Sequence, residues 1–226
     1  MQITFEKLKK LDFAVNEAYK TLRTNITFCG EDVRVVAVTS PVPDEGKTDV
    51  SFHLAQAFAE DGKKVLLIDA DIRKSVLEAR WGVDKETQGL THYLTGKEER
   101  EQVVCQTNIE NMDVIFTGPV SPNPSELLGS QKFADLLAWA RKEYQYVLID
   151  CPPICSVIDA AIVAKQCDGA VYVIESEAVS WRMAQSGKEQ LEKSGCRILG
   201  AVLSKVEMSG KGYGYGRYYR KYYGKK

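Results

Sequence analysis

The sequence predicts an α/β fold in which a doubly wound, mostly parallel β-sheet is flanked by helices. Several short apolar runs do not alternate with polar residues, as is typical of parallel strands that are covered on both faces. Segments with helical spacing lie between these runs, and strand connections of about a dozen residues or more indicate βαβ units. The predicted strands cover residues 33–38, 65–68, 146–149, 170–174 and 198–203.

The helices that should flank this sheet are predicted from apolar residues at intervals of three and four. They cover residues 47–60, 124–142, 157–166 and 180–193. The same spacing from Leu8 to Leu22 predicts another helix over about the first 28 residues, laid on the sheet or on a neighbouring molecule. We therefore expect one domain over residues 1–208, with this helix within residues 1–30.

The composition is that of a globular protein. The chain has 226 residues, of which 44% are hydrophobic and 27% charged, and this excludes a disulfide-stabilised miniprotein, a coiled coil and a wholly disordered chain. Neither an apolar run of about 18 residues nor a secretion signal is found, so a cytoplasmic protein is expected. The six cysteines form no Cys-x-x-Cys pair, which leaves zinc and redox sites without support.

The C-terminal segment, residues 209–226, differs from the rest of the chain. It contains six tyrosines, five glycines and no aliphatic residue, so we expect this tail to be disordered in isolation. The tail carries six basic and no acidic side chains, which leaves 24 basic against 31 acidic residues, a formal charge of −7, in residues 1–208. A positively charged tail thus follows a negatively charged body.

A phosphate-binding loop is predicted where Gly46-Lys47-Thr48 follows the first strand and begins a helix. Backbone N–H groups and the helix dipole would face a polyphosphate there. Lys47 would add a positive charge, and the Thr48 hydroxyl would take a magnesium position. An ordinary turn between strand and helix is the less favoured interpretation.

Aspartates follow two further apolar strands, in the segments VLLIDAD and YVLIDCPP. In a doubly wound sheet, ligands bind at the carboxyl ends of the strands, so Asp69, Asp71 and Asp150 should meet the phosphate loop in one crevice. Carboxylate oxygens suit Mg²⁺, and a further carboxylate can orient or deprotonate a nucleophile. Any one of these aspartates alone would more often be a cap or turn residue.

Three segments together carry a family resemblance. SPVPDEGKT, LLIDADIRK and YVLIDCPP resemble the Walker A, Walker A′ and Walker B motifs of the bacterial tyrosine kinases of capsular and exopolysaccharide synthesis. GLTHYLTG, TGPVSPNPSELLGS and the tyrosine-rich C-terminus are similar to the same family. The resemblance spans nearly the whole chain and implies the P-loop NTPase fold, as in the partition ATPases.

The resemblance implies a protein-tyrosine kinase that uses ATP and Mg²⁺ and phosphorylates its own tail on a neighbouring subunit, thereby regulating polysaccharide synthesis and export. It assigns the base for the tyrosine hydroxyl to Asp69, and phosphate binding to Lys47. Its implied magnesium ligands are Thr48, Asp71 and Asp150. Its implied ATP-binding residues are Pro43, Asp44, Glu45, Gly46, Lys47, Thr48 and Asp49. Its implied phosphoacceptors are Tyr213, Tyr215, Tyr218, Tyr219, Tyr222 and Tyr223.

The resemblance also implies partners. Glu17-x-x-Lys20-x-x-Arg23 is similar to the Glu-x-x-Arg-x-x-Arg oligomerisation motif of the family, which implies a homo-oligomeric ring, although lysine lacks the bidentate geometry of arginine. The family further implies a cognate tyrosine phosphatase and a transmembrane activator of the polysaccharide chain-length regulator type. This activator would hold the kinase at the inner face of the plasma membrane. No nucleic acid partner is expected.

The predicted nucleotide site departs from the family pattern. Asp44 stands where glycine is usual, and two like charges 4 Å apart repel by roughly 4 kcal/mol at an effective dielectric constant of 20, so an Asp44 carboxylate facing a phosphate would weaken ATP binding. Asp49 replaces a hydroxyl residue, His53 an asparagine, and Ser204 an asparagine that reads adenine. We expect an active enzyme with low ATP affinity.

Three other functions stay open at the level of sequence. A partition-type ATPase switch would share the loop and the fold. A pseudokinase scaffold would follow if Asp44 and Asp49 disable the loop. A binding module for single-stranded nucleic acid or an anionic membrane would use the tyrosines and basic residues of the tail.

Overall fold

The computed structural model describes residues 1–206, so the predicted tail lies outside the described residues. One seven-stranded sheet runs through this part of the chain in the order β3-β4-β2-β5-β1-β6-β7. All neighbouring strands are parallel except the pair β3 and β4. The predicted α/β fold is confirmed. The strands are β1 (Val35–Thr39), β2 (Val65–Asp69), β3 (Cys105–Gln106), β4 (Met112–Ile115), β5 (Tyr146–Asp150), β6 (Gly169–Glu175) and β7 (Ile198–Ser204).

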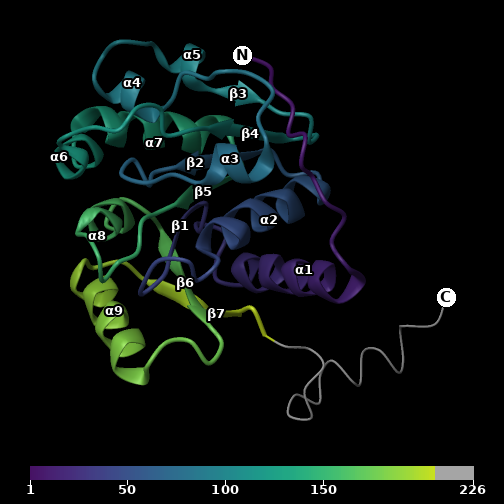
Figure 1. Cartoon of the computed structure of the whole chain (residues 1–226), viewed down its shortest axis with the longest axis vertical. Coiled ribbons are helices and arrows are strands. Elements are labelled where there is room, and N and C mark those ends of the chain that lie inside the picture. The colour runs from purple at the N-terminus through teal and green to yellow at the C-terminus, as the bar shows by residue number, and fades with distance from the viewer. Residues whose placement is uncertain (207–226) are drawn as a thin grey trace.

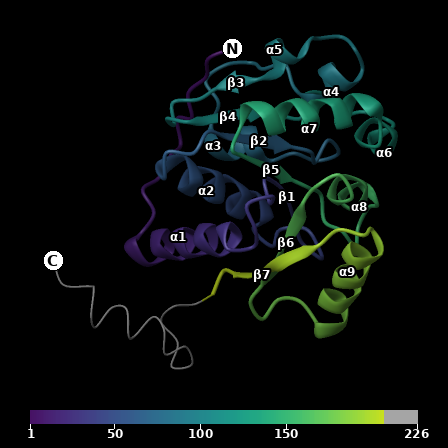
Figure 2. The same cartoon turned by 180° about the vertical axis from the view of Figure 1, so that it is seen from behind.

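Helices cover both faces of the sheet (Figures 1 and 2). One face is covered by α1 (Phe13–Thr27), α2 (Lys47–Glu60) and α3 (Leu77–Trp81). The other face is covered by α4 (Leu90–Leu94), α5 (Arg100–Val103), α6 (Pro124–Leu128), α7 (Gln131–Glu143), α8 (Asp159–Ala164) and α9 (Trp181–Lys193). No helix within residues 1–206 is both long and apolar enough to cross a membrane.

Two hydrophobic cores explain why the predicted strands are continuously apolar. Val35 and Ala37 of β1 belong to the core under α4–α9, whereas Val36 and Val38 belong to the core under α1–α3. All of these side chains are fully buried. Because successive side chains of a strand point to opposite faces, a strand with a core on each side needs apolar residues throughout.

Two strands escaped prediction. Strand β4 extends the sheet beyond β2, and β3 pairs antiparallel with it at the edge. Both are short, and Asp113 interrupts the apolar run of β4, where its carboxylate accepts a hydrogen bond of 2.7 Å from the Tyr144 hydroxyl. The apolar runs of these two segments are therefore too short to distinguish the strands from loops by sequence.

The predicted helix over residues 124–142 is wrong as a single element, because the chain forms α6 and α7 with a break between them. Gly129 ends α6, and the Ser130 side chain accepts a hydrogen bond from the Phe133 amide at the start of α7. Glycine is common where a helix ends, and serine is common where a helix begins, because its side chain can accept a hydrogen bond from a backbone amide of the first turn.

The predicted N-terminal helix is too long. It begins at Phe13, where Asp12 caps it by accepting a hydrogen bond of 2.9 Å from the Val15 amide. The preceding residues form no helix: Gln2 and Phe5 make isolated bridges to Gln106 and Val83, and a turn follows at residues 6–7. Leu8 and Leu11 therefore lie outside the helix, although they continue its apolar spacing.

Candidate active site

The phosphate loop connects β1 to α2, and its backbone takes unusual conformations. Gly46 caps the start of α2 with a φ of 84°, and Asp44 has a φ of 66°. Glycine adopts this left-handed region without strain, and aspartate tolerates it better than most residues. The loop therefore keeps its shape although Asp44 replaces the usual glycine.

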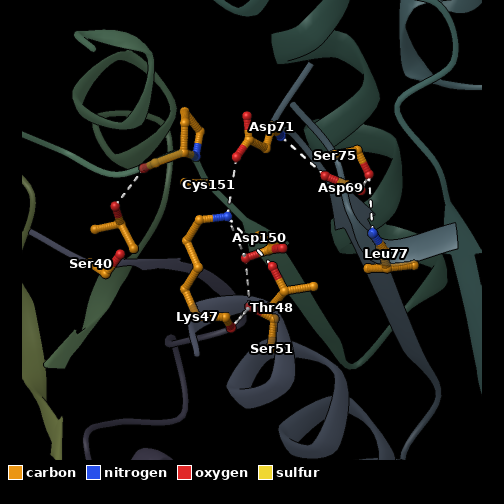
Figure 3. A network of polar contacts seen from close by, with 12 residues as sticks. Ser40, Lys47, Thr48, Ser51, Asp69, Asp71, Ser75, Leu77, Asp150 and Cys151 are labelled. Carbon is orange, nitrogen blue, oxygen red and sulfur yellow. Dashed lines mark hydrogen bonds and ion pairs between the residues drawn. The ribbon is translucent and has the colours of Figure 1, made fainter. Parts of the chain in front are cut away.

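Lys47 lies at the centre of the site (Figure 3). Its ammonium nitrogen is 3.2 Å from Asp71 Oδ2 and 3.8 Å from Asp150 Oδ1, and its side chain is 9% exposed. Burial lowers the pKa of Lys47, but the carboxylates of Asp150, Asp71 and Asp69 outweigh this effect and raise it overall. Lys47 thus carries a fixed positive charge between the ends of β2 and β5.

Asp150 ends β5 next to the first turn of α2. Its Oδ1 accepts a hydrogen bond of 3.1 Å from the Ser51 hydroxyl, which also donates to the Lys47 carbonyl at 2.8 Å. Burial raises the pKa of Asp150, and the Lys47 charge opposes this rise. Ser51 was not predicted as a site residue, although its place one turn after Lys47 in a predicted helix was an available signal.

Asp69 ends β2 opposite Asp150 in the neighbouring strand. Its carboxylate accepts hydrogen bonds from the Asp71 amide, at 3.1 Å, and from the Ser75 hydroxyl. Burial, together with the nearby charge of Asp150, raises the pKa of Asp69 to about 7. Ser75 was also missed, because only the folded Walker A′ loop brings it back to Asp69.

A cavity of about 220 Å³ lies over these groups. Its wall includes Asp44, Lys47 and Thr48 of the phosphate loop and Asp71 after β2. A second cavity of about 300 Å³ adjoins it at Asp71 and is lined by Ser75 among others. A crevice is therefore present at the carboxyl ends of the strands and Asp71 lines it, whereas Asp69 and Asp150 are not among its lining residues.

Two of the predicted ATP-binding residues do not line this cavity. The Glu45 side chain is 1% exposed and turns inward, and Asp49 forms an ion pair with Arg80. His53, which was considered as a departure in the nucleotide site, packs among the rings of Tyr19, Phe52 and Trp81 instead. The charge of Asp49 is thus partly neutralised, and His53 belongs to a packing cluster.

Arg73 of the Walker A′ loop is held by a buried carboxylate. Its Nε and Nη2 atoms donate to the Asp159 oxygens at 2.6 and 3.1 Å, and the Ser125 hydroxyl donates to the same carboxylate at 2.6 Å. The Asp159 side chain is 1% exposed, whereas that of Arg73 is 41% exposed and lines both cavities. Asp159 was not predicted from the sequence, because only the tertiary contact with Arg73 reveals its role.

The residues of the predicted oligomerisation motif make contacts within the chain. Glu17 and Lys20 pair with each other at 2.7 Å along α1. Arg23 donates to the Ala57 carbonyl at 2.9 Å and pairs with Asp61 at 3.3 Å, so it ties α1 to α2.

A phosphate loop between a strand and a helix, with buried carboxylates at the ends of the next strands, defines a P-loop nucleotide-binding protein. A family model described as an AAA domain matches residues 33–194. The tyrosine-protein kinase CpsD of Streptococcus pneumoniae is 42% identical over 220 residues, which cover 96% of each chain. The tyrosine-protein kinase YwqD of Bacillus subtilis is 40% identical over 196 residues, which cover 86% of this chain and 82% of that protein.

Solved structures give the same result. The chimerical protein CapA2B2 matches with a TM-score of 0.83 at 32% identity, covering 90% of this chain and 92% of that chain. The kinase domain of the Escherichia coli tyrosine kinase ETK matches with a TM-score of 0.79 at 35% identity, covering 88% and 80%. The septum site-determining protein MinD of Pyrococcus horikoshii, complexed with Mg-ADP, is more distant, with a TM-score of 0.66 at 26% identity and coverage of 77% and 72%. The chain belongs to the family of bacterial tyrosine-protein kinases.

Proposed function

We propose that this protein is an ATP-dependent protein-tyrosine kinase that phosphorylates the tyrosines of its own tail on a neighbouring copy. The observation that carries the proposal is the position of Lys47, which lines the cavity and lies between Asp71 and Asp150. Relatives named tyrosine-protein kinases, similar over nearly the whole chain, support the same reaction.

In this proposal Lys47 binds the β- and γ-phosphates of ATP, and the backbone amides of the loop bind the remaining phosphate oxygens. Thr48, Asp71 and Asp150 offer one hydroxyl and two carboxylates, a set of hard oxygen donors that fits Mg²⁺. Bound Mg²⁺ would neutralise charge on the phosphates. Lys47 must then exchange its carboxylate partners for phosphate oxygens.

The chemical step transfers the γ-phosphoryl group to tyrosine. The phenolic oxygen forms a bond to the γ-phosphorus, the bond from that phosphorus to the bridging oxygen breaks, and ADP leaves. We assign the phenolic proton to the Asp69 carboxylate, whose raised pKa suits a base that works near neutral pH. Because Asp69 is 1% exposed and bound by Ser75, the segment 71–75 has to shift for direct contact with the tyrosine.

The proposed acceptors are Tyr213, Tyr215, Tyr218, Tyr219, Tyr222 and Tyr223, in the glycine-rich tail. The broader role follows from the family resemblance: regulation of capsular or exopolysaccharide synthesis and export, in a homo-oligomeric ring. A transmembrane activator would bring the chain to the inner face of the plasma membrane, and a cognate tyrosine phosphatase would reverse the modification.

Mass spectrometry after incubation with Mg-ATP tests the proposed reaction directly. The purified chain, with and without an activator peptide, is compared with Lys47→Met and with a chain truncated at Ser209. We expect phosphate on residues 213–223, and none in Lys47→Met. A circular dichroism spectrum of that variant shows whether it is folded.

Other outcomes would favour other functions. Release of ADP without phosphotyrosine would favour a partition-type ATPase, for which the likeness to MinD is the supporting observation. Neither product, with or without the activator peptide, would indicate a scaffold whose phosphate loop has lost its function.

A further inference from the structure

The end of β7 contacts the phosphate loop from the side opposite the cavity wall formed after β2 and β5. The Ser204 hydroxyl donates to the Glu45 carbonyl oxygen at 2.6 Å. The Lys205 ammonium donates to the Asp44 carbonyl oxygen, also at 2.6 Å. Two consecutive carbonyl groups of the loop are thus bound by two consecutive residues at the edge of the sheet.

Further contacts fix this arrangement. Lys205 Nζ is 2.7 Å from Glu175 Oε2 at the end of β6. The inward-facing Glu45 carboxylate accepts hydrogen bonds from the Val42 amide at 3.0 Å and the Glu175 amide at 3.3 Å. Lys205 and Asp44 have φ values of 52° and 66°, in a region that non-glycine residues occupy only where their surroundings hold them.

These contacts determine where the loop amides point. The peptide bonds of the described chain are trans, and in a planar trans peptide the carbonyl and the N–H group point in opposite directions. Since the carbonyls of Asp44 and Glu45 face β7, the amides of Glu45 and Gly46 face the opposite side. The sheet order puts β5 and β2 on that side, and the cavity wall includes Asp71 after β2. Within residues 1–206 neither amide donates to a backbone carbonyl.

We propose that Ser204 and Lys205 are positioning residues for the phosphate loop. They hold two carbonyl oxygens away from the phosphates, so that the amides of Glu45 and Gly46 are free to donate to them. Lys205 contacts the backbone carbonyl of Asp44, the residue that departs from the family pattern, and its charge is paired with Glu175. This inference rests on the proposed function only for the identity of the ligand as ATP. In this inference Ser204 holds the shape of the loop instead of recognising the adenine base.

Binding measurements with two ligands test this inference. Titration calorimetry with Mg-ATP and with Mg-tripolyphosphate, which has no base or ribose, is carried out on the full chain. We expect Ser204→Ala and Lys205→Met to weaken both ligands about tenfold, the effect of losing one charge-assisted or loop-shaping hydrogen bond. Lys205→Arg keeps the charge and the donors and should stay within about threefold. The control Lys188→Met removes an exposed lysine of α9 that pairs with Glu192 at 2.6 Å, and should change neither affinity.

Three results would overturn the inference. Unchanged affinity of Ser204→Ala and Lys205→Met for both ligands would contradict it. Weaker binding of ATP with normal binding of tripolyphosphate would mean that the end of β7 contacts the nucleoside instead. If binding is weakened only in variants with a lowered melting temperature, and Lys205→Arg is one of them, Ser204 and Lys205 contribute to stability alone. A chain that binds both ligands but forms no phosphotyrosine would refute the proposed kinase reaction and leave this test valid.

Discussion

The buried carboxyl of Asp69 should make the stability of the nucleotide-free protein depend on pH. Its pKa is raised from 3.8 to about 7, so the folded chain binds a proton that the unfolded chain releases between these values. Stability is therefore lost as the pH rises from about 4 to about 7. Asp69→Asn removes this loss, so we expect the variant to be similar in stability to the natural chain near pH 4 and more stable than it by a few kcal/mol at pH 8, with the difference growing by up to about 1.4 kcal/mol per pH unit in between.

Thermal unfolding of both proteins at pH 4, 5, 6, 7 and 8 measures this difference. The asparagine oxygen can still accept from the Asp71 amide, so the comparison isolates the charge. Parallel curves for the two proteins would show that Asp69 is not the titrating group. Asp69→Asn should also lose phosphotransfer activity. This result would show that the carboxyl group that lowers stability is needed for the reaction.

Single residues also separate what sequence can and cannot reveal about the site. Lys47, Asp69 and Asp150 were predictable because each stands directly at a strand end, and the fold class then determines where strand ends meet. The inward turn of Glu45 was not predictable, since its partners lie in β6 and in its own loop. The role of Asp159 was not predictable either, since its partners Arg73 and Ser125 are distant in the sequence.

At the level of elements, Asp159 joins the Walker A′ loop to α8 and, through Ser125, to α6. Asp159→Asn keeps the size of the side chain but turns an amide group toward Arg73. We expect a loss of roughly 1–3 kcal/mol in the free energy of unfolding, the usual cost of hydrogen bonds to a charged group. We also expect a lower kcat/KM for ATP, because the loop that carries Asp71, a proposed magnesium ligand, is less well held.

Urea unfolding and steady-state kinetics measure the two effects of Asp159→Asn. Glu192→Gln is the matched control, since it removes one charge from an exposed pair that lies along a single helix. Its stability should change by less than about 0.5 kcal/mol. Equal effects of the two substitutions would show that Asp159 has no special role.

Close packing at Gly89 fixes the start of α4 against the segment after β4. A Cβ atom at Gly89 would lie 2.2 Å from the Gly118 nitrogen and 2.6 Å from the Phe116 oxygen, both backbone atoms that cannot rotate away. Gly89→Ala should therefore destabilise the chain by about 1–3 kcal/mol. At Gly200 in β7 a Cβ would meet nothing within 4 Å, so Gly200→Ala should be neutral or slightly stabilising. Melting temperatures compare the two, and similar values would contradict the packing argument.

The elements show why prediction succeeded for the sheet centre and failed at its edge. Strands β1, β2 and β5 are covered on both faces, so their sequences are apolar up to the polar residue that ends each strand. Strands β3 and β4 have only two and four residues, and their pairing depends on neighbours that a local pattern cannot show. The division between α6 and α7 was readable in principle from Gly129-Ser130, a typical pair of helix-end residues.

For the whole molecule, charge connects the proposed reaction to assembly. The body, residues 1–208, has a formal charge of −7, and the tail carries six basic side chains. Opposite charges favour contact of a tail with the body of a neighbouring copy. We therefore expect the tail to help hold the proposed oligomer together.

Phosphorylation of the tail should loosen that oligomer. Each phosphate adds about −1.5 to −2 charges, so about four phosphates bring the tail from +6 to zero or below and turn its attraction for the body into repulsion. Light scattering before and after full phosphorylation should record a fall in the mass of the assembly. A variant with phenylalanine in place of the six tail tyrosines keeps the charge of +6 and should keep its mass after the same treatment. An unchanged mass of the fully phosphorylated natural chain would show that other contacts hold the copies together. Raising the salt concentration should weaken the unphosphorylated assembly, because salt screens exposed charges over about 10 Å at 0.1 M and over less at higher concentrations.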